Sequence, residues 1–285
     1  EKVNLHIPLK IALYDAKGTK QMLQHNGELL SDVLNVTEKD QVFEFHGIYG
    51  RPIPALLCDF SAPVKLDYDY TTEQLLGLLK FADNQFARWD AAQMLFTQEL
   101  RRNVAHFQQG EAFDISPDVL TALAHVLENY EQDIELATLI LTLPKDIEFA
   151  ESFKTIDPDG IAAAREFMLV KIAEYLKEDL LRIYTHIRLE DYRVMQEDIA
   201  LRAMRNLCLS YLAYTNLGNN VVQKHYNNAN NMTDTLAALN MATKAALPCR
   251  DALLADFEQK WQHDGLVMDK WFALQATRPD ENVLE

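Results

Sequence analysis

The spacing of apolar residues changes once along this chain, and this change constrains the fold more than any other feature. Before residue 70, apolar and polar residues alternate, as in the segment from Leu5 to Leu13, which is typical of β-strands with one buried face. From Thr71 onward, apolar residues recur every three or four positions, which is typical of amphipathic helices. We therefore expect a mainly α fold, with a small β domain at residues 1–69 and a helical domain at residues 70–285.

The first domain contains four runs that carry a strand pattern. They are residues 5–13, 42–45, 56–60 and 64–70. Turn residues and prolines lie between these runs, and prolines are suited to strand starts and sheet edges. The pattern predicts an antiparallel unit of three to five strands.

Capping residues mark the expected helix starts. Thr71 and Gln74 have the spacing of a capping box, and Ser116 precedes a proline at the first helical position. Asp157 and Pro158 open the longest predicted helix, whose apolar stripe continues to Ile187. Further helices are expected before Gly110, over 134–143 and over 200–214 with an end at Gly218, and the Asn-rich stretch at 219–228 is expected to be a loop.

The last sixty residues predict three more helices. The first starts at Asn231, which can cap it together with Asp234, and the other two carry apolar stripes through Leu253–Trp261 and Val267–Leu274. Each helix has one apolar face and must bury that face against its neighbours. A succession of helix, short turn and helix indicates an irregular α-solenoid, that is, a superhelical array of helix pairs.

Charge and the length of the apolar runs argue against a nucleic-acid-binding protein and against a membrane-spanning one. The chain has 43 acidic and 27 basic residues and a formal charge of −16, so a phosphate backbone would be repelled and nucleic-acid binding is not expected. The longest apolar run, Leu136–Leu143, is too short to span a bilayer. The three cysteines are an odd number, widely spaced and set in apolar surroundings, which favours buried reduced thiols in a reducing compartment, and none lies in a C-x-x-C pair.

Several motifs resemble one known family. Residues 230–234 (NNMTD), 247–252 (LPCRDA) and 267–276 (VMDKWFALQA) are similar to the C-terminal helical domain of the bacterial aminopeptidase N family of zinc metallo-aminopeptidases. Residues 54–66 (PALLCDFSAPVKL) and 88–93 (RWDAAQ) resemble the same family in the same order. The resemblance implies that residues 1–69 are part of a β-sandwich and that 70–285 are a helical domain truncated at its C-terminal end.

The resemblance also implies a function. The family consists of hydrolases that remove N-terminal residues from peptides and serve peptide catabolism. Their helical domain is expected to cover the active site and restrict substrate access. The implied partners are the N-terminal and catalytic domains of the parent protein and, in the parent, peptides; the implied location is cytoplasmic, with a peripheral position at the inner membrane as an option. The alternative is a stand-alone α-solenoid that binds a protein partner.

The chemistry of the family is not encoded in this chain. A zinc aminopeptidase needs His-Glu-x-x-His on a helix, because two His four residues apart share one face and the Glu activates the metal-bound water. None of the eight histidines is followed by Glu, no two lie four residues apart, and the motif Gly-x-Met-Glu-Asn is also missing. We expect no catalytic residue and no metal ligand here, with zinc held in the parent's catalytic domain, and the substrate-binding residues stay unidentified.

The remaining candidates each have a functional and an ordinary interpretation. His106, His125 and His186 could be ligands, but helical patterns place them as surface or core histidines. Acids at 128–135 could attract a cation, but they suit a solvated helix terminus. Trp89, Trp261 and Trp271 could form a ligand-stacking patch, but their spacing favours packing in the core. Asn230, Asn231 and Asp234 could hold an interdomain or substrate contact, but helix capping is favoured. The candidate nucleophiles Ser61 and Cys208 lack an adjacent base in the sequence.

Overall fold

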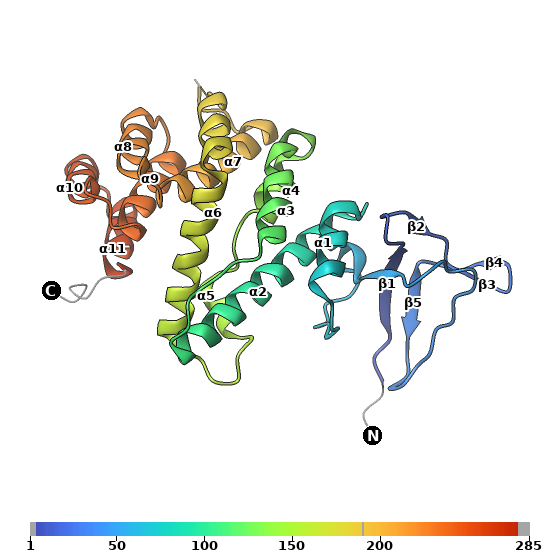
Figure 1. Cartoon of the computed structure of the whole chain (residues 1–285). Helices are drawn as coiled ribbons and strands as arrows, with labels where there is room; N and C mark the ends of the chain where they lie inside the picture. The colour runs from blue at the N-terminus through green and yellow to red at the C-terminus, as the bar shows by residue number, and fades with distance from the viewer. Residues whose placement is uncertain (1–3, 190, 279–285) are drawn as a thin grey trace. The chain divides into compact units, whose positions relative to one another are not determined.

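The protein divides into two compact units, which are described separately here. The structure, a computed structural model, describes residues 4–189 and 191–278. The first unit comprises residues 1–125 and 139–161, and the second comprises residues 126–138 and 162–285. Figure 1 shows strands only in the blue N-terminal part and helices through the rest of the chain. The predicted mainly α fold with a small antiparallel β portion is confirmed, whereas the boundary between residues 69 and 70 stays a prediction.

The β portion of the first unit is built around one long strand. β1 (Ile7–Tyr14) pairs through its first half with β5 (Val33–Val36), and through its second half with β2 (Lys20–Gln21) and β6 (Ile53–Leu56), always antiparallel. β3 (Gln24–His25) and β4 (Glu28–Leu29) form a separate two-stranded ribbon. Ile11, Leu13 and Leu23 form the buried core, and half-buried side chains such as Phe45 pack against it.

Two of the four expected strand runs are wrong. Residues 42–45 and 64–70 are not strands, although Phe45 enters the core and the Tyr70 hydroxyl donates to the Pro54 carbonyl. The third run is split: β6 ends at Leu56, and a 3-10 turn (Cys58–Phe60) follows through residues with positive φ, including Leu57. A side chain can be buried from an irregular segment as well as from a strand, and alternation alone does not separate the two cases.

The helices of the first unit begin and end at the predicted caps. α1 (Thr72–Phe81) carries the Thr71 and Gln74 capping box in full, and α2 (Gln85–Gln109) ends at Gly110 with φ 70°. Pro117 opens α3 (Pro117–Glu128), which runs into the second unit. The chain continues through a 3-10 turn (Tyr130–Gln132), α4 (Ile134–Ile140) and α5 (Asp146–Ala150), so α4 ends three residues before the predicted Leu143.

The second unit is an array of helices in which neighbours in sequence pack on each other. It contains most of α6 (Pro158–His186), followed by α7 (Gln196–Leu212), α8 (Gly218–Asn228), α9 (Met232–Lys244), α10 (Arg250–Trp261) and α11 (Gly265–Ala276). α9 contacts α7, α8, α10 and α11, and therefore lies at the centre of this array. Twelve buried residues from α7 to α11 and their connections, among them Leu239 and Phe257, form one continuous core.

The expected loop at 219–228 is wrong, because these residues form α8. The helix starts at Gly218, where a Cβ would lie 2.2 Å from the Ala213 carbonyl oxygen, so the chain can approach α7 closely only with glycine. Val222, His225 and Tyr226 form its buried face. The preceding helix ends at Leu212 instead of Gly218. In the sequence, the asparagines of this stretch obscure the helical spacing of these buried residues, which lie three and four positions apart.

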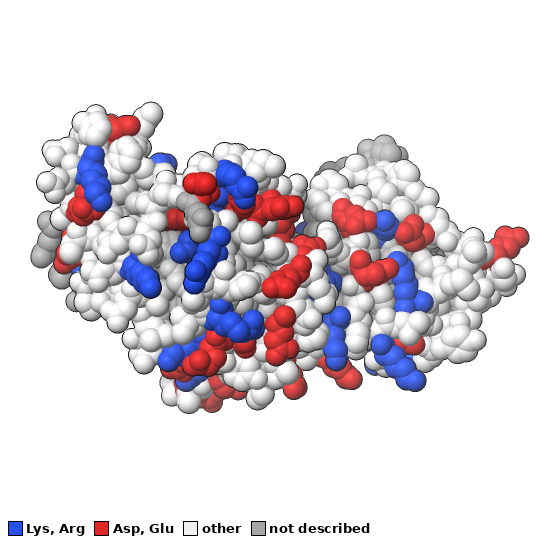
Figure 2. Space-filling view, turned by 90° about the horizontal axis from the view of Figure 1, so that it is seen from above, with Lys and Arg blue, Asp and Glu red and all other residues white. Residues whose placement is uncertain are grey.

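Within the described residues, no helix is long and apolar enough to cross a membrane. The three cysteines are free and buried, as expected from their apolar surroundings. On the face shown in Figure 2, Lys and Arg side chains are scattered among Asp and Glu rather than gathered in one basic surface.

Candidate functional site

Four helices of the second unit bring polar side chains together inside its core. Tyr184 comes from α6, Asn206 from α7, His225 from α8 and Asp234 from the first turn of α9. The exposed fraction is 2% for His225 and 4% for Asp234. Buried polar groups on this scale require partners, since an unpaired one costs free energy. We call this group, together with Arg205 and Asn231, the buried polar cluster.

Hydrogen bonds link the members of the cluster across the helices. The Tyr184 hydroxyl and His225 Nδ1 form a bond of 2.9 Å. The Asp234 carboxylate accepts hydrogen bonds from the side-chain amides of Asn206 and Asn231, each at 3.0 Å. One carboxylate therefore joins α7 to the start of α9. Asn231 also accepts the backbone N–H of Asp234 at 2.9 Å, which confirms it as the helix cap.

Three atoms of the cluster have unused hydrogen-bonding capacity. Arg205 Nε, Asn206 Oδ1 and His225 Nε2 are buried and have no hydrogen-bond partner among the described residues. His225 Nε2 lies 4.0 Å from Asp234 Oδ1, beyond direct bonding distance. The Arg205 guanidinium lies over the Tyr184 ring, 5.2 Å from its centroid. These three atoms therefore lack the partners that buried polar groups usually have.

The electrostatics of the cluster favour the neutral forms of His225 and Tyr184. Burial lowers the pKa of His225 to about 4, and the positive charge of Arg205 acts in the same direction, while Asp234 opposes it. Burial also raises the pKa of Tyr184. At neutral pH the imidazole is uncharged and its pKa lies far from the pH, so the pair is suited to hydrogen bonding between helices and poorly suited to general acid–base catalysis.

A cleft of about 510 Å³ opens beside the cluster, and Asn231 belongs to both. Its other walls come from the segment between α8 and α9 and from α10. Lys260 and the Tyr226 hydroxyl both bind the Asp256 carboxylate at 2.7 Å, and the Lys260 ammonium lies over the Tyr226 ring. The cleft is lined by Tyr226, Asn227, Ala229, Asn230, Asn231, Met232, Thr235, Asp256, Lys260 and Trp261.

The three residues of the predicted Asn-rich contact therefore have different roles. Asn230 is exposed in the cleft, Asn231 caps α9 and lines the cleft, and Asp234 is buried in the cluster. Capping, which we expected as the ordinary interpretation, accounts for Asn231. It does not account for the Asp234 carboxylate, which binds side chains on two elements instead of closing a capping box.

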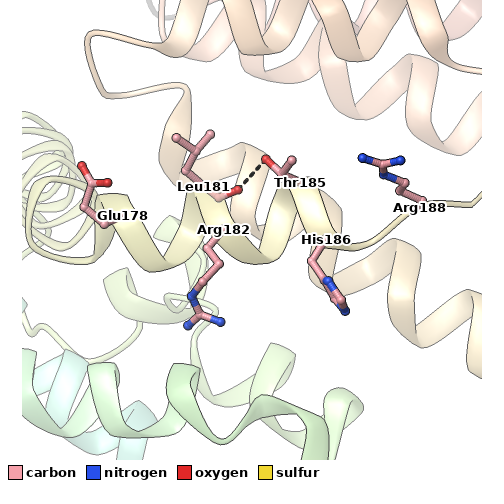
Figure 3. Close-up of a pocket in the computed structure, with 6 residues that line it drawn as sticks. All are labelled: Glu178, Leu181, Arg182, Thr185, His186 and Arg188. Atoms are coloured by element: carbon pink, nitrogen blue, oxygen red, sulfur yellow. Dashed lines mark hydrogen bonds between the residues drawn. The ribbon is translucent and has the colours of Figure 1, made fainter.

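A second hollow, of about 750 Å³, follows the C-terminal part of α6 and contains His186. Figure 3 shows Arg182 and His186 pointing to one side of the helix, while Leu181 and Thr185 point to the other. Arg182 binds Asp179 at 2.9 Å, and the Thr185 hydroxyl donates to the Leu181 carbonyl. Arg182 and Thr185 are thus bonded within their own helix, and every residue that lines the hollow except Leu181 is exposed, so the hollow offers little to a ligand.

The other predicted histidines and acids do not form a ligand set. His106 lies on α2, His125 on α3 and His186 on α6. His106 Nε2 is 3.7 Å from Glu111 Oε2. In the acid cluster at 128–135, Asp133 caps α4 by accepting the Leu136 N–H, as expected for a helix terminus.

The three tryptophans do not make one surface patch. Trp89 packs on Phe86 in the first unit, 5.6 Å between ring centroids. Trp261 and Trp271 pack against the core of the second unit, and Trp271 Nε1 donates to the Leu254 carbonyl at 3.0 Å. All three are half-buried, which favours the core interpretation, although Trp261 also lines the cleft.

Neither candidate nucleophile is activated. The Ser61 hydroxyl accepts the Lys10 backbone N–H at 2.9 Å. Cys208 is fully buried, and burial raises the pKa of its thiol to about 12, so the thiolate is not formed at neutral pH.

Known families and proteins are similar to this chain along its whole length. Residues 72–285 match a family model described as "Domain of unknown function (DUF3458_C) ARM repeats", and residues 1–69 match "Domain of unknown function (DUF3458) Ig-like fold". The chain is 86% identical over 285 residues to "Aminopeptidase N" of Haemophilus influenzae and 49% identical over 287 residues to "Aminopeptidase N" of Escherichia coli. Each match covers 100% of this chain and 33% of the relative.

A solved structure agrees with these matches. The crystal structure of Legionella pneumophila aminopeptidase A in complex with aspartic acid superposes with a TM-score of 0.83 at 26% identity. The superposition covers 98% of this chain and 33% of that one. The chain thus spans about a third of the length of its relatives.

Proposed function

This chain belongs to the aminopeptidase N family, as the part that carries its Ig-like and ARM-repeat domains, and on that premise we propose that it is the non-catalytic region of a zinc-dependent aminopeptidase. In this proposal other parts of the parent protein hold the zinc ion and hydrolyse the first peptide bond. The ARM-repeat region covers that site and limits access to short or unfolded peptides. The zinc ion would polarise the peptide carbonyl and activate water.

One observation carries the proposal. The chain is 86% identical to an aminopeptidase N along its entire length, yet none of its eight histidines has the His-Glu-x-x-His context. In the proposal, catalysis therefore comes from residues outside this chain. A rigid helical array with a continuous core is suited to hold a wall over such a site, since enclosing a reaction centre excludes water from it.

The proposal is tested by exchanging the matching part of a relative. The chimera is Haemophilus influenzae aminopeptidase N in which this chain replaces the corresponding residues. We expect it to cleave aminoacyl anilides and short peptides and to leave the N-termini of folded proteins intact, while this chain alone cleaves neither. The measurement is kcat/KM for substrates of increasing length.

The control is the same chimera without residues 72–285, used only if its catalytic part unfolds cooperatively on heating. Access control predicts that this variant loses its preference for short substrates. An unchanged length preference would contradict the role of the ARM-repeat region as a cover.

A second candidate is a stand-alone scaffold that binds a protein partner, which the match to ARM repeats favours. The two candidates differ in one simple observation. The reading frame of the gene either encodes His-Glu-x-x-His before Glu1, as the aminopeptidase proposal requires, or it does not.

A further inference from the structure

Three residues that are distant in sequence meet in the β portion of the first unit. His25, Glu44 and His46 each offer a ligand atom, and these atoms all lie within 4.8 Å of one another. His25 ends β3, whereas Glu44 and His46 belong to the irregular segment after β5. The spacings of nineteen and two residues match no metal motif, so sequence reasoning passed over this group.

The separation between the ligand atoms of His46 and Glu44 is that of a metal site. His46 Nε2 lies 3.4 Å from Glu44 Oε1. A tetrahedral zinc ion with bonds of about 2.1 Å holds its ligand atoms about 3.4 Å apart. The ring centroids of His25 and His46 lie 4.4 Å apart with the ring planes tilted by 34°, so the second imidazole lies beside the first. The other ligand-atom separations are no more than 4.8 Å, so binding an ion would require the half-buried His25 ring to move only a little.

The backbone around the group is fixed from both sides. His46 N donates to the Gln24 carbonyl at 2.7 Å, which ties the 44–46 segment to β3. Leu23 is buried in the core and Phe45 packs against it, so both ligand-bearing segments are anchored by a neighbouring apolar residue. Preorganised backbone lowers the entropy that a ligand must overcome to bind.

The chemistry of the three side chains selects the ion. Two imidazoles and one carboxylate suit Zn²⁺ and its neighbours among the transition metals, whereas Mg²⁺ and Ca²⁺ prefer oxygen ligands. Within the described part of the chain, the His25 imidazole contacts the His46 ring but makes no hydrogen bond or ion pair, so it is available to a ligand. We propose that His25, Glu44 and His46 bind one zinc-class divalent ion, which clamps the β3–β4 ribbon to the 44–46 segment.

Binding has a structural signature at Asn26. Its backbone N–H donates to His46 Nδ1 at 3.2 Å, so the neutral ring carries its proton on Nε2, facing Glu44. A metal ion at Nε2 moves that proton to Nδ1, which then can no longer accept from Asn26. The Asn26 amide must therefore change partner when the ion binds.

The site is independent of the proposed aminopeptidase role. The expectation of a chain without metal came from the missing His-Glu-x-x-His pattern, and the present group lies outside that pattern. An ion at this site would hold the 44–46 segment against β3 and would take no part in peptide hydrolysis. Failure of the chimera experiment above would leave this inference unaffected, and the reverse also holds.

The experiment uses the whole chain, freed of metals with a chelator and titrated with Zn²⁺ alone in a calorimeter. We expect one bound ion, and we expect His25→Gln and His46→Gln to weaken binding by at least about 10–100-fold, the loss that changes of outer-shell residues already cause. Mg²⁺ should give no heat at the same concentrations. Co²⁺ in place of Zn²⁺ should give the visible absorption of a tetrahedral site, and His25→Gln should abolish it.

The matched control is His6→Gln, because His6 is an exposed histidine of the same β portion that binds Asn35 and lies outside the group. It should bind Zn²⁺ as the parent chain does. A second readout is the amide resonance of Asn26 in chain labelled with ¹⁵N-asparagine, which should shift with Zn²⁺ in the parent and stay in place in His25→Gln. No zinc binding by the parent, or equal binding by all three variants, would overturn the proposal.

Discussion

In the β portion of the first unit, Ile11, Leu13 and Leu23 form one small buried cluster, whereas twelve buried residues of α7 to α11 and their connections form one continuous core in the second unit. In the β portion, three of the six described strands have only two residues, and irregular segments supply side chains such as Phe45. In the helical array every helix contributes a stripe of its own. Helices with continuous apolar stripes are stabilised by packing against one another. Short strands bury little apolar surface themselves and depend on side chains from loops and neighbouring elements.

The sharpest test of this comparison is to remove one aromatic ring from each core. Phe257→Ala removes a fully buried ring from the helical core and should lower the free energy of unfolding by about 3–5 kcal/mol. Phe45→Ala removes a half-buried ring from the β core and should cost about half as much. Urea unfolding followed by circular dichroism measures both. Equal losses would break the comparison, since the β core would then be as tightly packed as the helical one.

The second test concerns pH and the buried polar cluster. The pKa of His225 is lowered from 6.5 to about 4 in the folded state. Between pH 6.5 and pH 4, His225 is therefore protonated in the unfolded chain and neutral in the folded chain. Stability from this residue is therefore complete above pH 6.5 and is lost as the pH falls toward 4. The loss is about 1.4 kcal/mol per pH unit, or about 3 kcal/mol in total.

The check is the difference in unfolding free energy between the parent chain and His225→Asn at several pH values. This difference should shrink steadily from pH 6.5 to pH 4, because asparagine binds no proton. His6→Asn, at an exposed histidine, serves as the control and should give a flat difference. A flat difference for His225→Asn as well would show that the imidazole is not held neutral.

The smallest effect is expected from the helix caps. Thr71→Ala removes the cap of α1 in the first unit and should cost about 1 kcal/mol. Asn231→Ala removes the cap of α9 and also the amide that binds Asp234, so it should cost about 2 kcal/mol. Thermal unfolding of both variants gives the ranking. If Asn231→Ala were the milder change, the link to Asp234 would add nothing beyond capping.

The same contrast explains how far the sequence predicts this fold. Thr71, Gly110, Pro117 and Asn231 marked helix borders correctly because capping depends on the local chain alone. The strand runs at 42–45 and 64–70 were wrong because pairing depends on partners elsewhere in the chain. The helix α8 was missed because its asparagines outweighed the spacing of Val222 and Tyr226.

The site was harder to predict than the fold. The motif at 230–234 pointed to Asn231 and Asp234, but Tyr184, Arg205 and His225 come from three other helices, and nothing in their spacing brings them together. One signal was available: His225 lies between Val222 and Tyr226 on one helical face, where a polar residue must be buried with a partner. The group of His25, Glu44 and His46 had no such signal, because it depends on a loop folding back onto β3.

The shared carboxylate of Asp234 has a consequence for how the second unit opens. Since its bonds reach α7 and the start of α9, and His225 ties α8 to α6, no one of these four helices can detach without stranding polar groups of another. The Arg205 guanidinium of α7 also lies over the Tyr184 ring of α6, which joins these two pairs of helices, so transient opening should involve all four as a single cooperative unit in native-state hydrogen exchange. Buried amides of α6 to α9 should share one exchange free energy, while α11, whose exposed residues include Phe272, should exchange separately and faster.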